Sequence, residues 1–375
     1  MLKILELFGG IGACSKALER LEIDYEIVDY VEIDKYAVKS FNAIHNTNFK
    51  PQDITTWDKD IEVDLIMHGS PCQDFSLAGK QAGGDKNSGT RSSLMYETIR
   101  IVDKLKPKYV IWENVKNLLS KKHKHNFDAY LETMEQLGYT NYYQVLNAKD
   151  YGIPQNRERV FTVSIRDDSG IRKGAFLGTF YLEDYEANNF EFPPKQELEL
   201  KLKDMLEDEV DEKYYLSDKM INFFYKNEQV QKEKGNGFRF NVTDGNVIAK
   251  TITTRAGSRM DDNFLKIKEA TKQGYKEAYE GDYVNLAYPD SKTRRGRVGK
   301  QVAQTLTTSD NIGVIANDLR IRKLTPKECW RLMGFDDEDF EKASKVNSNT
   351  QLYKQAGNSI VVNVLMAIFK EMIKW

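Results

Sequence analysis

The residues best suited to covalent chemistry lie in segment 69–76, where a cysteine directly follows a proline. Cys72 comes soon after an apolar run, residues 63–67, that is typical of a buried strand. Pro71 fixes its own φ angle and favours an extended conformation for Ser70, so the turn that carries the thiol is stiff. A thiol placed in this way could attack a substrate, but most cysteines are buried structural residues. Position alone leaves both interpretations open.

Two further features suggest a reactive edge. Glu113 ends the apolar run 109–112, and burial beside such a run raises the pKa of a carboxyl and favours its protonated form; the alternative is a surface glutamate. Segment 155–159 presents Arg157 and Arg159 on one side of an extended chain. Alternating arginines often form a solvated ladder, but this pair precedes a core strand, which favours a rigid, positioned pair.

A glycine-rich segment, residues 8–12, follows the first strand-like run and opens a helix. Its glycines permit a ligand to approach the backbone, and a helix N-terminus favours negative charge. Glu32, after the second strand, is placed to accept hydrogen bonds from ribose hydroxyls. The third glycine of a dinucleotide fingerprint is replaced by Ser15. The pattern therefore favours an adenosine-containing cofactor other than NAD.

These residues need a scaffold, and the first 165 residues alternate strand and helix patterns. We expect strands at 3–7, 25–32, 65–67, 109–112, 142–146 and 160–165, and helices from the glycine segment to about residue 20 and at 35–44, 92–105 and 126–137. This order predicts an α/β fold with a doubly wound, mostly parallel sheet. Ligands bind such sheets at the carboxyl ends of the strands, where Gly10, Glu32, Cys72 and Glu113 are expected.

The regular pattern stops between residues 172 and 318, where the chain is polar with irregular short strands. This region contains an echo, residues 251–254 and 305–308, that fits two hairpin segments as well as it fits a functional repeat. Helices resume at 325–333, with Thr325 as N-cap and Pro326 at the first position, and at 360–374.

Bulk properties limit the class of protein. The 375 residues are 40% hydrophobic, enough for a large core and two domains. The net charge of −2 excludes a globally basic protein, so nucleic-acid binding would need a local patch. Three scattered cysteines do not form a disulfide framework, and no histidine has a zinc-like spacing. We expect a cytoplasmic protein without a signal peptide, membrane span or metal.

Together the blocks resemble the C5-cytosine-specific DNA methyltransferases of bacteria and phages. They occur in that family's order and cover the first 165 and last 55 residues: 8–12, Glu32, 53–54, 71–73, 91–94, 113–115, 155–159, 322–335 and 357–359. The Pro-Cys, Glu-Asn-Val and Gln-x-Arg-x-Arg blocks in one chain form a specific signal.

The resemblance implies a Rossmann-like catalytic domain (1–171 and 346–375) and a smaller, irregular, β-rich target-recognition domain (172–345). Cys72 would attack C6 of a cytosine flipped out of duplex DNA. Glu113 would bind N3 and the exocyclic amine, and Arg159, supported by Arg157, would hold O2. S-adenosyl-L-methionine would supply the methyl group and leave as S-adenosyl-L-homocysteine. The base that removes the C5 proton is open; His68 is a poor candidate because it lies lower in its strand.

The resemblance also implies a cofactor pocket and DNA contacts. The expected cofactor residues are Phe8, Gly10, Ile11, Gly12, Glu32, Ile33, Asp53, Ile54, Pro71, Leu94, Asn358 and Ser359. The expected DNA-binding residues are Gln73, Ser76, Lys80, Arg91, Arg294, Arg295, Arg297 and Thr305. The loop 74–91 would close over the flipped base, or is an ordinary surface loop. The basic cluster 292–297 suits phosphate or guanine contacts, or is a solvated turn.

Some positions depart from the family pattern. Gln52 replaces a glycine, Ala13 stands where glycine is frequent, and Ile33 replaces an aromatic residue. The family's Thr-Leu motif is assigned to Thr305 because it lies nearer Arg320, with Thr251 as the competing copy.

We expect a monomer that acts on double-stranded DNA, with or without a cognate restriction endonuclease. The alternatives are a tRNA cytosine methyltransferase of the same family and an inactive DNA-binding relative.

Overall fold

The computed structural model describes residues 1–71, 94–167, 190–235, 239–240, 242–243, 245–254, 262–268, 283–285, 298–299, 312–314 and 319–373. Nine residues with expected roles lie outside these ranges: Cys72, Gln73, Ser76, Lys80, Arg91, Arg294, Arg295, Arg297 and Thr305. The chain divides into two compact units. The first consists of Met1–Glu207, Val247–Ala256 and Thr325–Trp375, and the second of Asp208–Asn246 and Gly257–Leu324.

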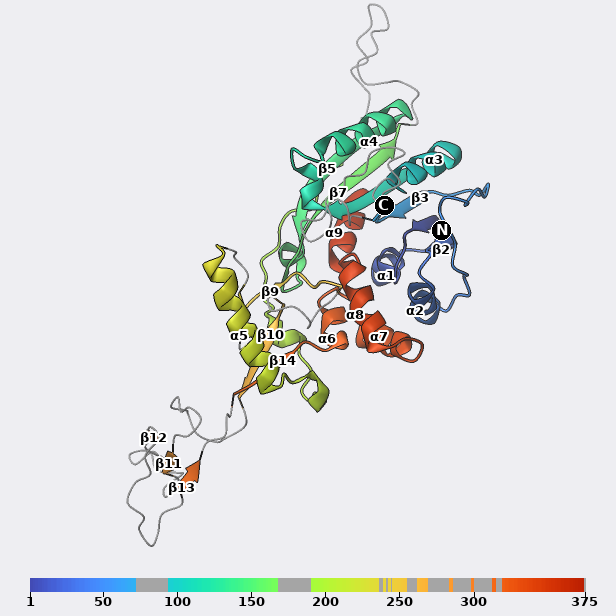
Figure 1. Cartoon of the computed structure of the whole chain (residues 1–375). Coiled ribbons are helices and arrows are strands. Elements are labelled where there is room, and N and C mark those ends of the chain that lie inside the picture. Colours follow the sequence, from blue (N-terminus) through green and yellow to red (C-terminus); the bar gives the residue numbers. More distant parts are fainter. Residues whose placement is uncertain are drawn as a thin grey trace, which may run out of the picture. The chain divides into compact units, whose positions relative to one another are not determined.

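The first unit is built on a six-stranded sheet in the order β2-β1-β3-β4-β7-β5 (Figure 1). Its strands are β1 (Leu2–Leu7), β2 (Tyr25–Val31), β3 (Leu65–His68), β4 (Tyr109–Val115), β5 (Tyr139–Asn147) and β7 (Glu158–Arg166). The first four are parallel, and β7 runs antiparallel to both β4 and β5. The predicted α/β class, the mostly parallel sheet and the closing strand pair are confirmed.

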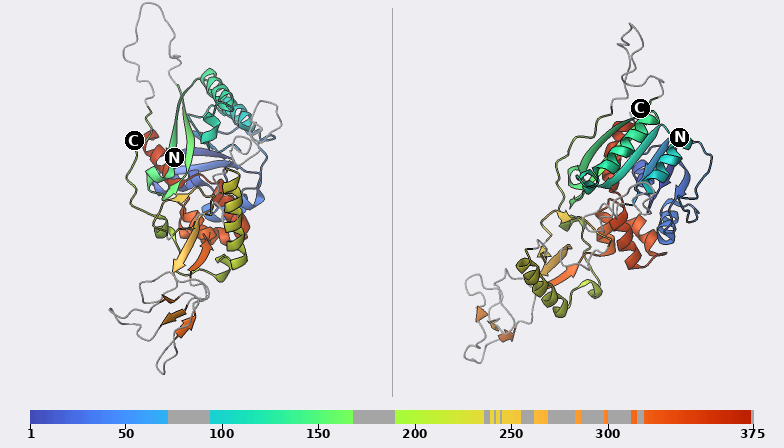
Figure 2. Two further views of the ribbon diagram at one scale, coloured as in Figure 1. Left: turned by 60° about the vertical axis from the view of Figure 1, so that its left-hand side comes forward. Right: turned by 45° about the horizontal axis from the view of Figure 1, so that its top comes forward.

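Helices cover both faces of this sheet (Figure 2). They are α1 (Ala13–Arg20), α2 (Lys35–His45), α3 (Met95–Leu105), α4 (Lys124–Gln136) and α9 (Val362–Met372). On one face, Leu5 and Trp112 share a buried cluster with Val102 of α3 and Tyr130 of α4. On the other face, α1 packs on β1 and α9 packs on α1. Because β1 leads to β2 on one side and β3 leads to β4 on the other, the strand order switches between β1 and β3, where ligands bind such sheets.

The other described elements of the first unit are short helices, 3-10 turns and two short strands that pair with each other. These strands are β6 (Gln155–Asn156) and β9 (Ala249–Lys250). The helices are α6 (Pro326–Arg331), α7 (Asp337–Ser344) and α8 (Asn349–Asn358), with 3-10 turns at Lys116–Leu119, Ala148–Tyr151 and Leu202–Met205. The predicted cap of α6 is confirmed, because Glu328 N donates to Thr325 Oγ1 at 3.2 Å and Thr325 N donates to Glu328 Oε2 at 2.8 Å.

The boundary between the units differs from the one expected at residue 345. Residues 325–345 belong to the first unit, as do 190–207 and 247–256. Buried hydrogen bonds explain this placement: Trp330 Nε1 donates to the carbonyl of Leu352 at 3.0 Å, and Gln155 Nε2 donates to that of Leu332 at 2.7 Å. Lys16 of α1 also forms ion pairs with Asp336 and Asp339 at 3.0 and 3.1 Å.

The second unit is smaller and contains short strands, as the sequence predicts. A helix, α5 (Asp218–Glu233), accompanies β8 (Val242–Thr243), β10 (Phe264–Lys268) and β14 (Leu319–Lys323), and a separate sheet contains β11 (Tyr283–Asn285), β12 (Val298–Gly299) and β13 (Ile312–Val314). A 3-10 turn spans Glu212–Tyr214. The hydrophobic core of this second unit contains a cluster of Phe224, Phe240 and Phe264. The sixteen-residue helix α5 was not predicted.

Neither a membrane-spanning helix nor a metal-binding cluster was found in the part of the chain that the structure describes. Its helices are too short or too polar to cross a bilayer. Among the same residues, no group of three or more His, Cys, Asp or Glu side chains could hold a metal ion.

Candidate active site

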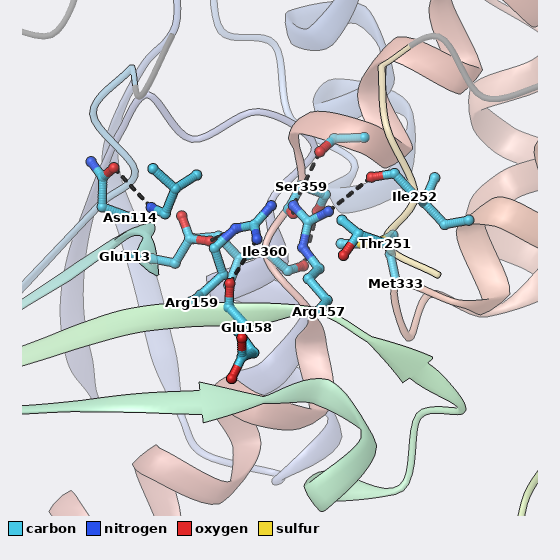
Figure 3. Close-up of polar contacts among 12 residues, drawn as sticks. Glu113, Asn114, Arg157, Glu158, Arg159, Thr251, Ile252, Met333, Ser359 and Ile360 are labelled. Atoms are coloured by element: carbon cyan, nitrogen blue, oxygen red, sulfur yellow. Dashed lines mark hydrogen bonds and ion pairs between the residues drawn. The ribbon is translucent and has the colours of Figure 1, made fainter. Parts of the chain in front are cut away.

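Glu113 and Arg159 meet at the carboxyl end of β4. The antiparallel register pairs Val115 of β4 with Arg159, so the start of β7 lies beside the end of β4. Arg159 Nε approaches Glu113 Oε1 to 3.1 Å, and Figure 3 shows the guanidinium turned toward the carboxylate. The register that closes the sheet therefore also forms this ion pair.

The environment of Glu113 makes its carboxyl easier to protonate. Its side chain is only 11% exposed. Burial raises the pKa of Glu113, while the charges of Arg159 and Arg157 oppose that rise without cancelling it. The raised pKa predicted from the sequence is confirmed. When it is protonated, a carboxyl can donate a hydrogen bond as well as accept one.

Arg157 lies nearby but binds a different set of atoms. It is 3% exposed, and its guanidinium donates to three backbone carbonyls, those of Ile252 at 3.0 Å, Ser359 at 2.8 Å and Gly357 at 3.1 Å. Figure 3 shows it turned toward Ile252 and Ser359, while Arg159 turns toward Glu113. The prediction that Arg157 and Arg159 point to the same side of the chain is wrong. Residue 157 falls between β6 and β7, where the alternation of side chains along a strand is interrupted. Arg157 thus ties three distant segments together.

One of these segments is the first copy of the threonine echo. Thr251 Oγ1 donates to the carbonyl of Asn156 at 2.7 Å, and Ile252 N donates to Gln155 Oε1 at 2.9 Å. At Gly357, a Cβ would stand 2.3 Å from Thr254 N, so only glycine allows this approach. The sequence favours Thr305, which lies outside the described residues. Apart from the weak echo, nothing in the sequence indicates that Thr251 is anchored beside Arg157.

The residues before Cys72 are fixed against β4. Trp112 Nε1 donates to Ser70 Oγ at 2.9 Å, and Asn114 Nδ2 donates to the carbonyl of Ser70 at 3.3 Å. A side chain at Gly69 would begin 3.9 Å from Glu113 Oε2. The chain that enters Pro71–Cys72 therefore passes directly beside Glu113, although Cys72 itself lies outside the described residues.

His68 points into the core and away from this rim. It is fully buried, stacks on Trp112 with ring centroids 5.6 Å apart, and lies 3.2 Å from the hydroxyl of Tyr130. Burial lowers the pKa of His68 to about 3, so it is neutral at physiological pH. Its depth agrees with the low rank that the sequence gives it as a base.

The ends of β1 and β2 form the second part of the site. Glu32 accepts hydrogen bonds from Gly10 N at 3.3 Å and Asp34 N at 2.8 Å, and burial raises the pKa of Glu32. Gly10 has φ of 57°, and no atom lies within 4 Å of the place where its Cβ would be. The space beside the Gly10 backbone is therefore open to a ligand, and the Glu32 carboxylate is held next to it.

The other expected cofactor residues differ in what they expose. Ile33 is 69% exposed, so its apolar side chain is free to stack. Asp53 is exposed and accepts from Thr55 N at 2.9 Å, whereas Ile11 and Ile54 are buried. The carbonyl of Ser359 is taken by Arg157. The remaining ones are Phe8 and Gly12, with φ of 53° and 82°, Pro71, Leu94 at the start of α3, and Asn358 at the end of α8.

A family model for C-5 cytosine-specific DNA methylases matches residues 2–374. The chain belongs to this family. It is a DNA (cytosine-5)-methyltransferase, and the alternative of a tRNA methyltransferase is not favoured because the curated relatives at 31–35% identity are phage orphan and bacterial type II methyltransferases. The inactive-relative alternative is likewise not supported.

Curated members of the methylase family are similar along their whole length. An orphan methyltransferase of Bacillus phage SPR, M.SPRI, is 35% identical over 99% of this chain and 97% of its own. The type II methyltransferase M2.ScrFI of Lactococcus lactis subsp. cremoris is 34% identical over 100% of this chain and 99% of its own. Among solved structures, S. pombe Dnmt2 methyltransferase has a TM-score of 0.62 at 19% identity, covering 99% of this chain and 98% of that one. At this identity the last likeness shows the fold alone.

Proposed function

We propose that the methyltransferase acts on a cytosine flipped out of double-stranded DNA and that Cys72 is its nucleophile. The observation that carries the proposal is the Glu113–Arg159 pair beside Gly69 and Ser70, which lead into Cys72. Covalent attack needs a thiol, a group that can protonate or hydrogen-bond the ring nitrogen, and a fixed cation. Glu113 and Arg159 supply the last two, and Gly69 and Ser70 beside them lead into the thiol of Cys72.

The Cys72 thiolate forms a bond to C6, and electron density moves onto N3, where the protonated Glu113 carboxyl donates a hydrogen bond. Arg159 holds O2 and keeps Glu113 oriented through their 3.1 Å contact. C5 is now nucleophilic and would take the methyl group from the bound cofactor as the methyl–sulfur bond breaks, with the electron pair of that bond staying on sulfur. Loss of the C5 proton to a base, followed by breaking of the Sγ–C6 bond, restores the ring and the thiolate. Arg157 does not contact the base in this proposal; it is a positioning residue that holds the backbone beside the site.

The cofactor we propose is S-adenosyl-L-methionine, held at the ends of β1 and β2. The open backbone at Gly10, the Glu32 carboxylate and exposed Ile33 suit an adenosine group, with Glu32 accepting from ribose hydroxyls. We expect Asp53 to meet the adenine, since its side chain is accessible. When bound, the cofactor supplies an electrophilic methyl group and leaves as S-adenosyl-L-homocysteine. The residues present fit this group.

We assign target recognition to the second unit and catalysis to the first. We expect the basic cluster 292–297 and Thr305 to contact DNA, together with Gln73, Ser76, Lys80 and Arg91 near the nucleophile. The enzyme is proposed to act as a monomer. Because similar relatives include an orphan and a type II methyltransferase, the proposal holds with or without a cognate restriction endonuclease.

Bisulfite sequencing tests this function directly. The full chain is expressed in a bacterial host that lacks C5-methylcytosine, alongside Glu113→Gln as the matched inactive control. We expect methylation of one cytosine in one sequence context with the wild-type chain and none with the variant. An unmethylated genome in cells that contain folded wild-type protein would overturn the proposal.

A further inference from the structure

Tyr30, near the end of β2, holds the glycine segment 8–12. Its hydroxyl donates to the carbonyl of Gly10 at 2.6 Å, and the side chain is fully buried. Its ring stacks on Phe41 of α2 with centroids 3.8 Å apart. A Cβ at Gly9 would stand only 2.7 Å from this ring. The aromatic surface therefore fixes the backbone of the segment, and the hydroxyl fixes the peptide of Gly10.

The same part of β2 also holds the loop that carries Asp53. Gln52 Nε2 donates to Asp29 Oδ1 and to the carbonyl of Tyr30, both at 2.8 Å, and Gln52 N donates to the carbonyl of Glu32 at 2.9 Å. A glycine at position 52 would keep only the last bond. The residue that departs from the family pattern thus makes two side-chain contacts to β2.

Asp29 is itself held firmly. It is 2% exposed, accepts from Trp57 Nε1 at 2.7 Å, and forms an ion pair with Lys59 at 2.7 Å. Burial opposes ionisation of Asp29, but the hydrogen bonds of Lys59, Trp57 and Gln52 lower its pKa. A charged acceptor strengthens the bond from Gln52.

We infer that Tyr30 and Gln52 are positioning residues that hold the two cofactor-binding loops, 8–12 and 53–54, on strand β2 at a fixed separation. This inference rests on the proposed cofactor site. A preformed site avoids the entropic cost of ordering its loops when the ligand binds. Burial, with the carboxylates of Glu32 and Glu6, raises the pKa of Tyr30, so its hydroxyl keeps the proton that it donates. Neither residue needs to touch the ligand to affect its affinity.

Calorimetry with S-adenosyl-L-homocysteine tests the inference without relying on turnover. Tyr30→Phe removes one hydroxyl and keeps the ring stack, and Gln52→Ala removes the amide. We expect each variant to raise Kd about fivefold, the loss typical of one or two hydrogen bonds. The KM for the methyl donor should rise in parallel, with kcat and the KM for DNA within about twofold of wild type. Tyr143→Phe, which alters an exposed hydroxyl on β5, is the matched control and should leave Kd unchanged.

The outcomes separate this inference from the proposed cofactor site. If Gln52→Ala and Tyr30→Phe are both folded, judged by their melting temperatures, and both bind with wild-type Kd, the positioning role is wrong. If Tyr30→Phe does not fold, Gln52→Ala alone decides. An unchanged Kd in Glu32→Ala would instead remove the cofactor site itself. A rise in KM for DNA equal to that for the methyl donor would indicate general loosening and would also contradict the inference.

Discussion

Two regions along the carboxyl edge of the sheet, the β1–β2 end and the β4–β7 end, each carry a carboxyl group of raised pKa. The two regions hold this group by different means. At the β1–β2 end, Glu32 accepts from the backbone N–H groups of Gly10 and Asp34. At the β4–β7 end, Glu113 meets the guanidinium of Arg159. Burial raises both pKa values. The difference fits the proposed ligands, because ribose hydroxyls carry no charge whereas a cytosine under attack gains electron density.

The largest effect is expected from a substitution at the β4–β7 end. Glu113→Gln keeps the size of the side chain but replaces the ionisable carboxyl with an amide that cannot act as an acid, so we expect kcat to fall about 10³-fold. The affinity for S-adenosyl-L-homocysteine should not change, because the β1–β2 end is intact. Single-turnover methyl transfer and calorimetry measure the two quantities. A kcat within tenfold of wild type would show that Glu113 has no catalytic role.

The second effect separates the two arginines. Arg157→Met leaves the buried carbonyls of Ile252, Gly357 and Ser359 without this donor, so the free energy of unfolding should fall by about 3–5 kcal/mol. Arg159→Met is the matched control and should lose activity with a smaller loss of stability, because the Glu113 carboxyl, whose pKa burial raises, can take up a proton when its cation is removed. Urea denaturation gives the comparison. Equal stability losses in the two variants would contradict the different roles.

A third carboxyl, Glu6 near the end of β1, shows the effect of burial where hydrogen bonds from Ser15, and not an ion pair, oppose the rise in pKa. It accepts hydrogen bonds from Ser15 N at 3.1 Å and from Ser15 Oγ, and burial raises the pKa of Glu6 to about 7. The folded state therefore binds this proton more tightly than the unfolded chain, in which the pKa is near 4.5. The resulting stability is complete below about pH 4.5 and is lost as pH rises through 7, in total about 3 kcal/mol.

Glu6→Gln removes this titration. We expect the difference in unfolding free energy between wild type and variant to shift by up to that amount between pH 5 and pH 8, in favour of the variant at high pH. Urea denaturation at the two values measures it. A pH-independent difference would mean that Glu6 is not desolvated in the folded state.

The smallest expected effect concerns the β1–β2 end. Glu32→Gln should raise the Kd for S-adenosyl-L-homocysteine about 30-fold, the value of a hydrogen bond to a charged group. DNA affinity, measured by fluorescence anisotropy, should stay within twofold because the substitution is confined to the cofactor end. Weakened binding of both ligands to the same degree would remove the distinction between the two ends.

Local signals in the sequence predict the parts of the molecule that depend on neighbouring residues. Thr325 and Pro326 identify the start of α6, and apolar runs identify the strands that place Glu32 and Glu113. Contacts between distant segments are not predictable in this way. The three carbonyl partners of Arg157 come from residues 95 to 202 positions away. Helix α5 was missed because its region is polar overall, although Ser217 provided a cap signal.

The most direct test of the central claim is covalent trapping. Duplex DNA with 5-fluorocytosine at the methylated position is incubated with the enzyme and S-adenosyl-L-methionine. Fluorine replaces the C5 proton and cannot be abstracted by a base, so the elimination that breaks the Sγ–C6 bond is blocked. We predict a protein–DNA adduct stable to denaturing electrophoresis, with the modified peptide containing Cys72, and no adduct with Cys72→Ser. An adduct of equal yield in Cys72→Ser, or one mapped to Cys14 or Cys329, would contradict the account.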